Sequence, residues 1–162
     1  MNTARIAGLA VVGALAVPAD AAACSCIAID ERTQLRTADA AVVGTVTRVG
    51  TPTPRADGTM SSADPITVTI RVARSYKRTI GRTLRVRTAL SGASCGLSAR
   101  KGERLGILLT RSGARWTTSL CQRVGIGRLD AAARRLGLRR RVPRAGARSS
   151  RVLMTARSTT CG

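Results

Sequence analysis

Residues 66–72, with the sequence ITVTIRV, decide the fold of this chain. Aliphatic and polar side chains alternate there at a period of two, and most of the residues are β-branched. Successive side chains of a strand point to opposite faces. The segment therefore predicts a strand with one buried aliphatic face and one exposed polar face.

Four further segments predict strands in the same way. They are residues 41–49 (AVVGTVTRV), 83–90 (TLRVRTAL), 104–110 (RLGILLT) and 115–120 (RWTTSL). Stretches rich in Gly, Pro, Ser and Asp separate them, and Ser112-Gly113 predicts a hairpin turn. Five short strands within about 80 residues predict a mainly β chain built as a small barrel or sandwich.

Two short helices complete the predicted elements. Asp30 is positioned to cap a helix over residues 31–38. Residues 129–136 (LDAAARRL) have a helical composition, and Gly137 follows them as a stop signal. We therefore expect one or two short helices beside the strands.

The composition limits both the core and the chemistry. The chain has 162 residues, of which 28 are Lys or Arg and 8 are Asp or Glu, so its formal charge is +20. It has no His, no Phe, one Trp and one Tyr, and 44% of it is hydrophobic. This length favours one domain, and its core must be aliphatic. Because the commonest general base and metal ligand is missing, we expect no enzyme, no cofactor and no metal site.

The first segment predicts export. One Arg precedes a 12-residue apolar run at residues 6–17, and small residues lead to Cys24. A membrane span needs roughly 20 apolar residues, so residues 1–23 predict a signal peptide, and we expect no transmembrane segment in the mature chain. Cleavage after Ala23 gives a secreted, extracellular protein that begins at Cys24. The alternative is a lipoprotein signal, in which case a lipidated Cys24 anchors the protein at the cell surface.

The positive charge is unevenly spread along the chain. Residues 123–162 contain 11 Arg and a single acid, Asp130. We therefore divide the mature chain into a folded domain at 24–123 and an Arg-rich tail at 124–162, partly helical or disordered. The tail is expected either to contact an anionic cell envelope or another polyanion, or to be simply solvated.

Five cysteines suggest a disulfide framework. They are Cys24, Cys26, Cys95, Cys121 and Cys161. In an exported chain, disulfides are the default. Cys24 and Cys26 point the same way on an extended segment, so each can reach a different distant partner. The alternative is a four-cysteine zinc site, which is disfavoured because the paired C-x2-C spacing of such sites is missing. The pairing itself stays open at this point.

Several short motifs together resemble one known family. They are Cys24-Ser25-Cys26 at the predicted mature N-terminus, Tyr76-Lys77 after a strand, Ser94-Cys95-Gly96 before Lys101-Gly102-Glu103, and Thr118-Ser119-Leu120-Cys121. Over residues 24–123 the chain resembles the tissue inhibitors of metalloproteinases and their netrin-like bacterial relatives. The resemblance implies a five-stranded OB-fold barrel, with bridges from Cys24 to Cys95 and from Cys26 to Cys121.

The resemblance also implies a function. In that family the N-terminal cysteine donates its free α-amine and carbonyl oxygen to the zinc of a target metalloprotease, and the next residue enters the adjacent pocket. Carried over, Cys24 is the chelating residue and Ser25 the pocket residue. The sequence departs from the family in two ways. Residues 27–37 lack the cysteine of a third bridge, and the second disulfide-rich domain of animal members is absent.

A second function follows from the charge. The barrel is alternatively an envelope-associated structural or polyanion-binding module that inhibits no protease and acts through Arg. Nucleic acid is disfavoured as the partner, because OB-folds bind single strands by stacking bases on aromatic side chains. The chain offers only Tyr76 and Trp116, which we expect in the core or at the barrel rim.

Overall fold

The computed structural model describes residues 24–143. The predicted signal peptide, residues 1–23, lies outside this range. Residues 144–162, with Cys161 and the last part of the predicted tail, also lie outside it.

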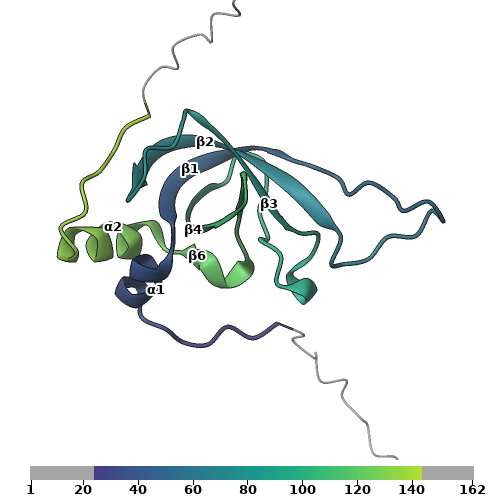
Figure 1. Ribbon diagram of the computed structural model, residues 1–162, viewed down its shortest axis with the longest axis horizontal. Coiled ribbons are helices and arrows are strands. Elements are labelled where there is room, and N and C mark those ends of the chain that lie inside the picture. Colours follow the sequence, from purple (N-terminus) through teal and green to yellow (C-terminus); the bar gives the residue numbers. More distant parts are fainter. Residues whose placement is uncertain (1–23, 144–162) are drawn as a thin grey trace, which may run out of the picture.

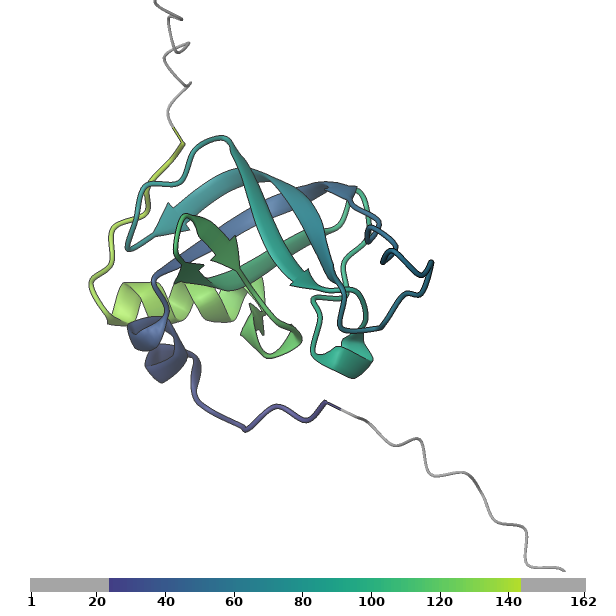
Figure 2. The same ribbon diagram turned by 45° about the vertical axis from the view of Figure 1, so that its right-hand side comes forward.

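Five strands close into a small barrel, seen from two sides in Figures 1 and 2. The strands run in the order β1-β2-β3-β5-β4, and β4 pairs back with β1. The β3–β5 pair is parallel and the other pairs are antiparallel. The predicted mainly β, five-stranded OB-fold-like barrel with short helices is thus confirmed. The strands are β1 (Ala40–Val49), β2 (Pro65–Tyr76), β3 (Thr83–Ala89), β4 (Arg104–Ser112) and β5 (Arg115–Thr117), with β6 (Arg123–Val124) added beside β4.

The barrel interior is aliphatic, as the composition requires. In the antiparallel register of β2 and β3, Val68 lies opposite Val86 and Ile70 opposite Leu84, and all four side chains are buried. Trp116 only packs against this core from its edge. The period-two pattern of residues 66–72 therefore has the buried face that the sequence predicts.

Two helices cover one side of the barrel (Figure 1). The helices α1 (Glu31–Thr37) and α2 (Ile126–Arg135) lie beside each other. They form a second apolar cluster with the outer faces of β1 and β4, in which Leu35, Val43, Leu108 and Leu129 are buried. Residues 40–43 of β1 are accordingly buried on both faces, which explains their uninterrupted apolar sequence. Within residues 24–143 no helix is long and apolar enough to cross a membrane.

The predicted and observed elements differ at their ends. The last predicted strand, residues 115–120, stops at Thr117, and residues 120–122 form the 3-10 turn η2 (Leu120–Gln122) instead. The second helix begins three residues before its predicted start and is followed by Gly137 at φ 66°. The strand β6 was not predicted, because two residues are too few to show a period.

The folded unit extends past residue 123, where we placed the domain boundary. Leu129, Ala132 and Ala133 occupy one face of α2 and are buried against the helix-side cluster. After α2 the chain returns along β2, where Arg141 and Ser75 exchange two backbone hydrogen bonds of 2.9 Å. Residues 124–143 thus belong to the fold, because a helix with one small apolar face must bury it.

A polar network joins the end of β2 to both helices. Arg74 donates through Nε (3.1 Å) and Nη2 (2.5 Å) to the two carboxylate oxygens of Asp130 on α2, and Tyr76 Oη donates to Oδ1 at 2.6 Å. Lys77 Nζ donates to the carbonyl oxygens of Leu35, Arg36 and Ala38 at the end of α1. The Tyr76-Lys77 motif therefore secures the helices, and a compact ammonium with three donors suits three converging carbonyls.

The network sets two pKa values. Burial raises the pKa of Asp130, but the hydrogen bonds from Arg74 and Tyr76 outweigh burial and leave that pKa below its ordinary value. Burial, together with the hydrogen bond to Asp130, raises the pKa of Tyr76. Because the pKa of the folded carboxyl is lowered, the ionised Asp130 stabilises the fold at pH values above the unfolded pKa of about 3.9. This stabilisation is lost as pH falls through the pKa of the folded state. Because the pKa of the Tyr76 phenol is raised, the protonated phenol stabilises the fold below the unfolded pKa of about 10. This stabilisation is lost as pH rises through the pKa of the folded state.

We predict that Asp130→Asn lowers the free energy of unfolding by about 2–4 kcal/mol at pH 7, because Arg74 is left buried beside a neutral amide. The difference from the wild type begins to shrink below about pH 4, where the carboxyl of the unfolded chain takes up a proton, and it continues to shrink until pH falls through the lowered pKa of the folded carboxyl. Urea denaturation at pH 7 and pH 3 measures both values. Asp57→Asn, in an exposed loop where the carboxylate bonds only Thr59, is the control and leaves stability nearly unchanged. Equal destabilisation by Asp130→Asn at both pH values would contradict the charge-based account.

Candidate functional site

The N-terminal segment, residues 24–29, runs along the outside of the barrel without regular secondary structure (Figure 2). It leads into α1, where Asp30 Oδ1 accepts from the backbone N–H groups of Arg32 (3.0 Å) and Thr33 (3.1 Å). Gln34 Nε2 donates to the carbonyl of Ile29 at 2.9 Å. The predicted cap of the first helix is thus confirmed, and it fixes the point at which the N-terminal segment ends and α1 begins.

Two disulfides attach this segment to the barrel. Cys24 bridges Cys95, with a Cα–Cα distance of 5.4 Å, and Cys26 bridges Cys121 at 5.3 Å. These are the pairs that the family resemblance implied. The four-cysteine zinc alternative is excluded, since all four thiols are consumed. The bridges close loops of 71 and 95 residues, for which chain-entropy models give upper figures of about 4.4 and 4.7 kcal/mol.

The two anchoring cysteines lie in adjacent turns. Cys95 follows the 3-10 turn η1 (Gly92–Ser94) between β3 and β4, and Cys121 lies in η2 between β5 and β6. Leu120 N–H donates to the carbonyl of Cys95 at 2.8 Å and ties the turns together. Both bridges therefore lead to one rigid edge of the barrel.

Gly96 explains part of the Ser94-Cys95-Gly96 motif. A Cβ atom at this buried position would lie 2.2 Å from the carbonyl oxygen of Ala89 and 2.7 Å from that of Ser91. The turn can therefore pass this close to β3 only with glycine. The adjacent Cys95 adopts φ 58°, which directs the chain back toward β4.

Ser25, the predicted pocket residue, is exposed between the two bridges. Its hydroxyl makes no hydrogen bond to any described residue. The neighbouring Ile27 and Ile29 are 82% and 46% exposed. A shallow hollow of about 380 Å³ adjoins them; it is lined by Ser25, Ile27, Ile29, Gln34, Thr37, Ala38, Leu108, Thr110, Cys121 and Gln122. The structure thus brings Cys24, Ser25 and Cys95 together at an exposed, partly apolar edge.

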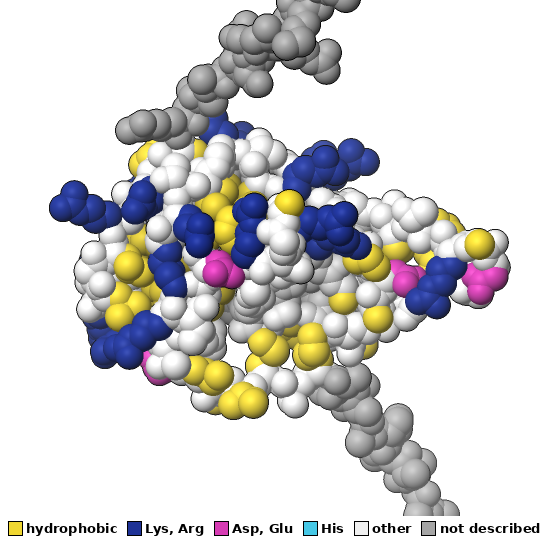
Figure 3. All heavy atoms as spheres, viewed as in Figure 1, with side chains coloured by type: hydrophobic (Ala, Val, Ile, Leu, Met, Phe, Trp, Pro, Cys, Tyr) yellow, Lys and Arg dark blue, Asp and Glu magenta, His cyan; other side chains and the backbone are white. Residues whose placement is uncertain are grey.

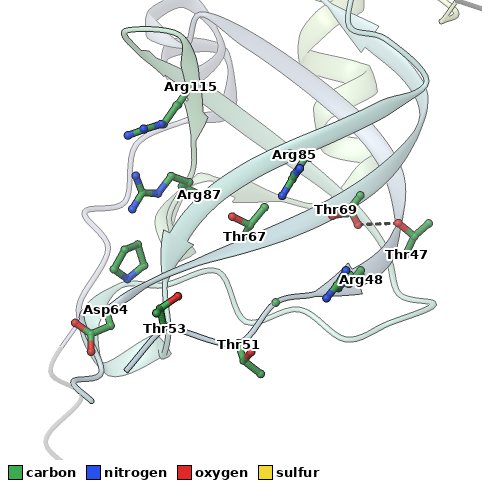
Figure 4. Close-up of a pocket in the computed structure, with 12 residues that line it drawn as sticks. Thr47, Arg48, Thr51, Thr53, Asp64, Thr67, Thr69, Arg85, Arg87 and Arg115 are labelled. Carbon is green, nitrogen blue, oxygen red and sulfur yellow. Dashed lines mark hydrogen bonds between the residues drawn. The ribbon is translucent and has the colours of Figure 1, made fainter. Parts of the chain in front are cut away.

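A second surface is strongly basic. Lys and Arg side chains are spread over the upper and left parts of the face shown in Figure 3, with few acidic groups between them. Four arginines line one groove of about 960 Å³ on the outside of β2 and β3, shown in Figure 4. We call it the cationic groove; its lining residues are Thr47, Arg48, Gly50, Thr51, Thr53, Asp64, Pro65, Thr67, Thr69, Arg85, Arg87 and Arg115.

Sequence reasoning missed this groove, because it counted the positive charge of the barrel without placing the arginines on one face of the sheet. A signal was nevertheless present. The polar positions of residues 67–71 and 83–87 are occupied only by Thr and Arg, at a strict period of two. Had the two segments been placed side by side, they would have indicated one Thr- and Arg-lined sheet face.

No protein-family model and no curated protein matches this chain. The interpretation of both surfaces therefore depends on their own geometry and chemistry.

We predict that the double variant Cys26→Ser, Cys121→Ser keeps the barrel but loosens the N-terminal segment, which is then bridged only through Cys24. Within the described residues, that segment has only two bridges and the Ile29 bond to hold it. Limited proteolysis should become faster within residues 24–29 while β2 and β3 stay resistant. The pair Cys24→Ser, Cys95→Ser provides the matched comparison. Unchanged cleavage within residues 24–29 in both variants would show that the bridges do not position the segment.

Gly96→Ala should destabilise the protein, because the added methyl group meets the backbone of β3. The same substitution at Gly127, in α2 with open space around it, should stabilise by about 0.5–1 kcal/mol. Thermal melts of the two variants compare one chemical change in two environments. Equal shifts in Tm would refute the close-approach argument for Gly96.

Proposed function

We propose that the protein is an exported, disulfide-stapled binding module that inhibits zinc metalloproteases through its N-terminus at Cys24. The observation that carries the proposal is the pair of bridges from Cys24 and Cys26, which hold an exposed Ser25 at one edge of a closed barrel. Bridges and barrel agree with what the family resemblance implies. The proposed location is extracellular, or the cell surface if Cys24 is lipidated.

The chemistry of the N-terminus supports this proposal. Catalytic zinc keeps one coordination position open for water or substrate. An α-amine has a pKa of about 7.7–8.0, so a substantial neutral fraction with a free lone pair exists at neutral pH, whereas a lysine amine is almost fully protonated. After cleavage following Ala23, the amine and carbonyl oxygen of Cys24 would chelate the target's zinc and displace its water.

The rigidity of the bridged N-terminal segment and its exposed apolar surface also support the proposal. The bridges reduce the conformational entropy that Cys24 and Ser25 would lose on entering a protease cleft. Ile27, at 82% exposed, is a large apolar side chain next to the proposed contact. Its burial by a partner would contribute about 1.5–3 kcal/mol. Cys24, Ser25 and Ile27 together form one continuous contact region for the proposed target.

We predict that the oxidised protein beginning at Cys24 inhibits a zinc endopeptidase, and that one extra Ala before Cys24 abolishes the inhibition. The extra residue converts the amine into an amide, which has no lone pair available for zinc. Residual protease activity is measured against inhibitor concentration. The control carries an extra Ala after Gly162 and inhibits like the unmodified protein. Intact mass establishes that the amine of Cys24 is free in the sample.

The pH dependence provides an independent check. Inhibition should weaken as pH falls below about 7.7, because the protonated amine cannot donate to zinc. A small hydroxamate inhibitor, measured on the same protease, reports how the enzyme's own zinc site responds to pH. Equal inhibition by the extended and unextended forms would rule out chelation through Cys24.

A further inference from the structure

The cationic groove is independent of the N-terminus and has its own chemistry. We propose that it binds an acidic polysaccharide, an extended glycan whose anionic groups pair with its arginines and whose hydroxyls bond its threonines. The lining residues of the groove and those of the hollow at Ser25 have no member in common.

The strand register creates the groove surface. Across the antiparallel β2–β3 pair, Thr67 lies opposite Arg87 and Thr69 opposite Arg85. No two arginines lie directly opposite each other there, which would be destabilising. Arg85 and Arg87 are two residues apart on one strand, so their Cα atoms are separated by about 6.7 Å. The face thus carries a row of hydroxyl groups on β2 beside a row of guanidinium groups on β3.

The flanking elements add two more cations. Arg48 comes from the end of β1 and Arg115 from the start of β5. Figure 4 shows Arg87 and Arg115 beside each other with their guanidinium groups directed to the same side, and Arg48 at the opposite end of the groove. The cations are therefore distributed along the groove, which favours an extended ligand with several anionic groups over a single small anion.

The groove arginines lack acidic partners in the part of the chain that the structure describes. The ion pairs of residues 24–143 use Arg55, Arg74, Arg123 and Arg128, and none uses Arg48, Arg85, Arg87 or Arg115. Asp64 is the one acid in the lining. It accepts from Ser61 N–H at 2.6 Å and from Arg55 at 2.9 Å, and the pKa of Asp64 is lowered, first by the Ser61 bond.

This arrangement favours an anionic ligand. Four cations gathered in one groove repel each other, and an anion between them relieves that repulsion. Guanidinium groups bind sulfate, phosphate and carboxylate with two parallel hydrogen bonds. Because Asp64 is already paired with Arg55, it neutralises little of the charge that the groove offers.

The threonines distinguish a glycan from a bare polyanion. Thr47 donates to the backbone carbonyl of Thr69, whereas Thr51, Thr53, Thr67 and Thr69 make no side-chain hydrogen bond within residues 24–143. A threonine hydroxyl both donates and accepts. Sugar hydroxyls can use both capacities, whereas polyphosphate has no donor at neutral pH.

The lining also disfavours nucleic acid. It contains no aromatic side chain on which a base could stack. Tyr76 is buried beneath α2, and Trp116 packs against the barrel core. An acidic polysaccharide needs no such platform, because its charges and hydroxyls are on its outside.

The test compares variants with equal charge loss. The probe is fluorescein-labelled, partially sulfated dextran, and its binding to oxidised protein is followed by fluorescence anisotropy at about 0.15 M salt, where long-range attraction is screened. Arg85→Gln with Arg87→Gln should weaken binding at least about tenfold, since two charge-assisted contacts are lost. The control, Arg139→Gln with Arg140→Gln, removes two exposed cations outside the groove and should weaken binding less than about threefold.

A second variant tests the hydroxyls. Thr67→Val with Thr69→Val keeps the β-branched shape and should weaken binding of sulfated dextran about three- to tenfold. Its binding of long-chain polyphosphate should not change. Uncharged dextran should not bind the wild type. Circular dichroism and Tm establish that each variant is folded. If a double variant does not fold, the single variant Arg115→Gln tests a cation at the groove rim.

Three results would overturn the proposal. Equal weakening by the groove and control arginine pairs would mean that overall charge, not the groove, attracts the probe. Unchanged dextran binding in the threonine variant would mean that sugar hydroxyls are not recognised. Groove-dependent binding of oligothymidylate at least as tight as that of sulfated dextran would assign the site to nucleic acid.

Discussion

The pleat of β2 is the constraint on which both the core and the surface depend. Ile66, Val68 and Ile70 face the barrel interior, while Thr67 and Thr69 face the cationic groove. Since β2 pairs with β1 on one side and β3 on the other, its register fixes both neighbours. A slip of one residue would place hydroxyls and a guanidinium in the core and aliphatic side chains in water. The stability of the barrel therefore holds the groove chemistry in place.

An aliphatic barrel without phenylalanine needs support from outside its interior. The helices provide a second apolar layer, and Asp130 joins α2 to the end of β2 through Arg74 and Tyr76. The disulfides act on a different part of the chain, the segment before α1. The ion pair and the disulfides thus attach α2 and the N-terminal segment to the barrel. The strands of the barrel itself are held together by apolar burial and backbone hydrogen bonds.

The sequence predicts much of the fold, because the deciding signals are local. The alternation of residues 66–72, the cap at Asp30 and the stop at Gly137 each lie within a few residues of the element they define. The bridge pairs followed from resemblance, since spacing alone leaves the pairing open. The contact of Arg74 with Asp130 spans 56 residues, and the groove requires the β2–β3 register. Neither is visible before the strands are placed side by side.

The two proposed sites make different demands on the protein. Ser25 and its bridges need a rigid edge, which η1 and η2 provide, whereas the groove needs cations that the fold does not use. Gln or Lys at 85 and 87 would preserve the alternation of β3, and a neutral residue would relieve repulsion between neighbouring guanidinium groups. The alternation of β3 therefore does not by itself require arginine at these positions. Within the described chain, the two sites share no lining residue. The two proposals thus assign different partners to different parts of one small barrel, a protease to its edge and a glycan to the groove on β2 and β3.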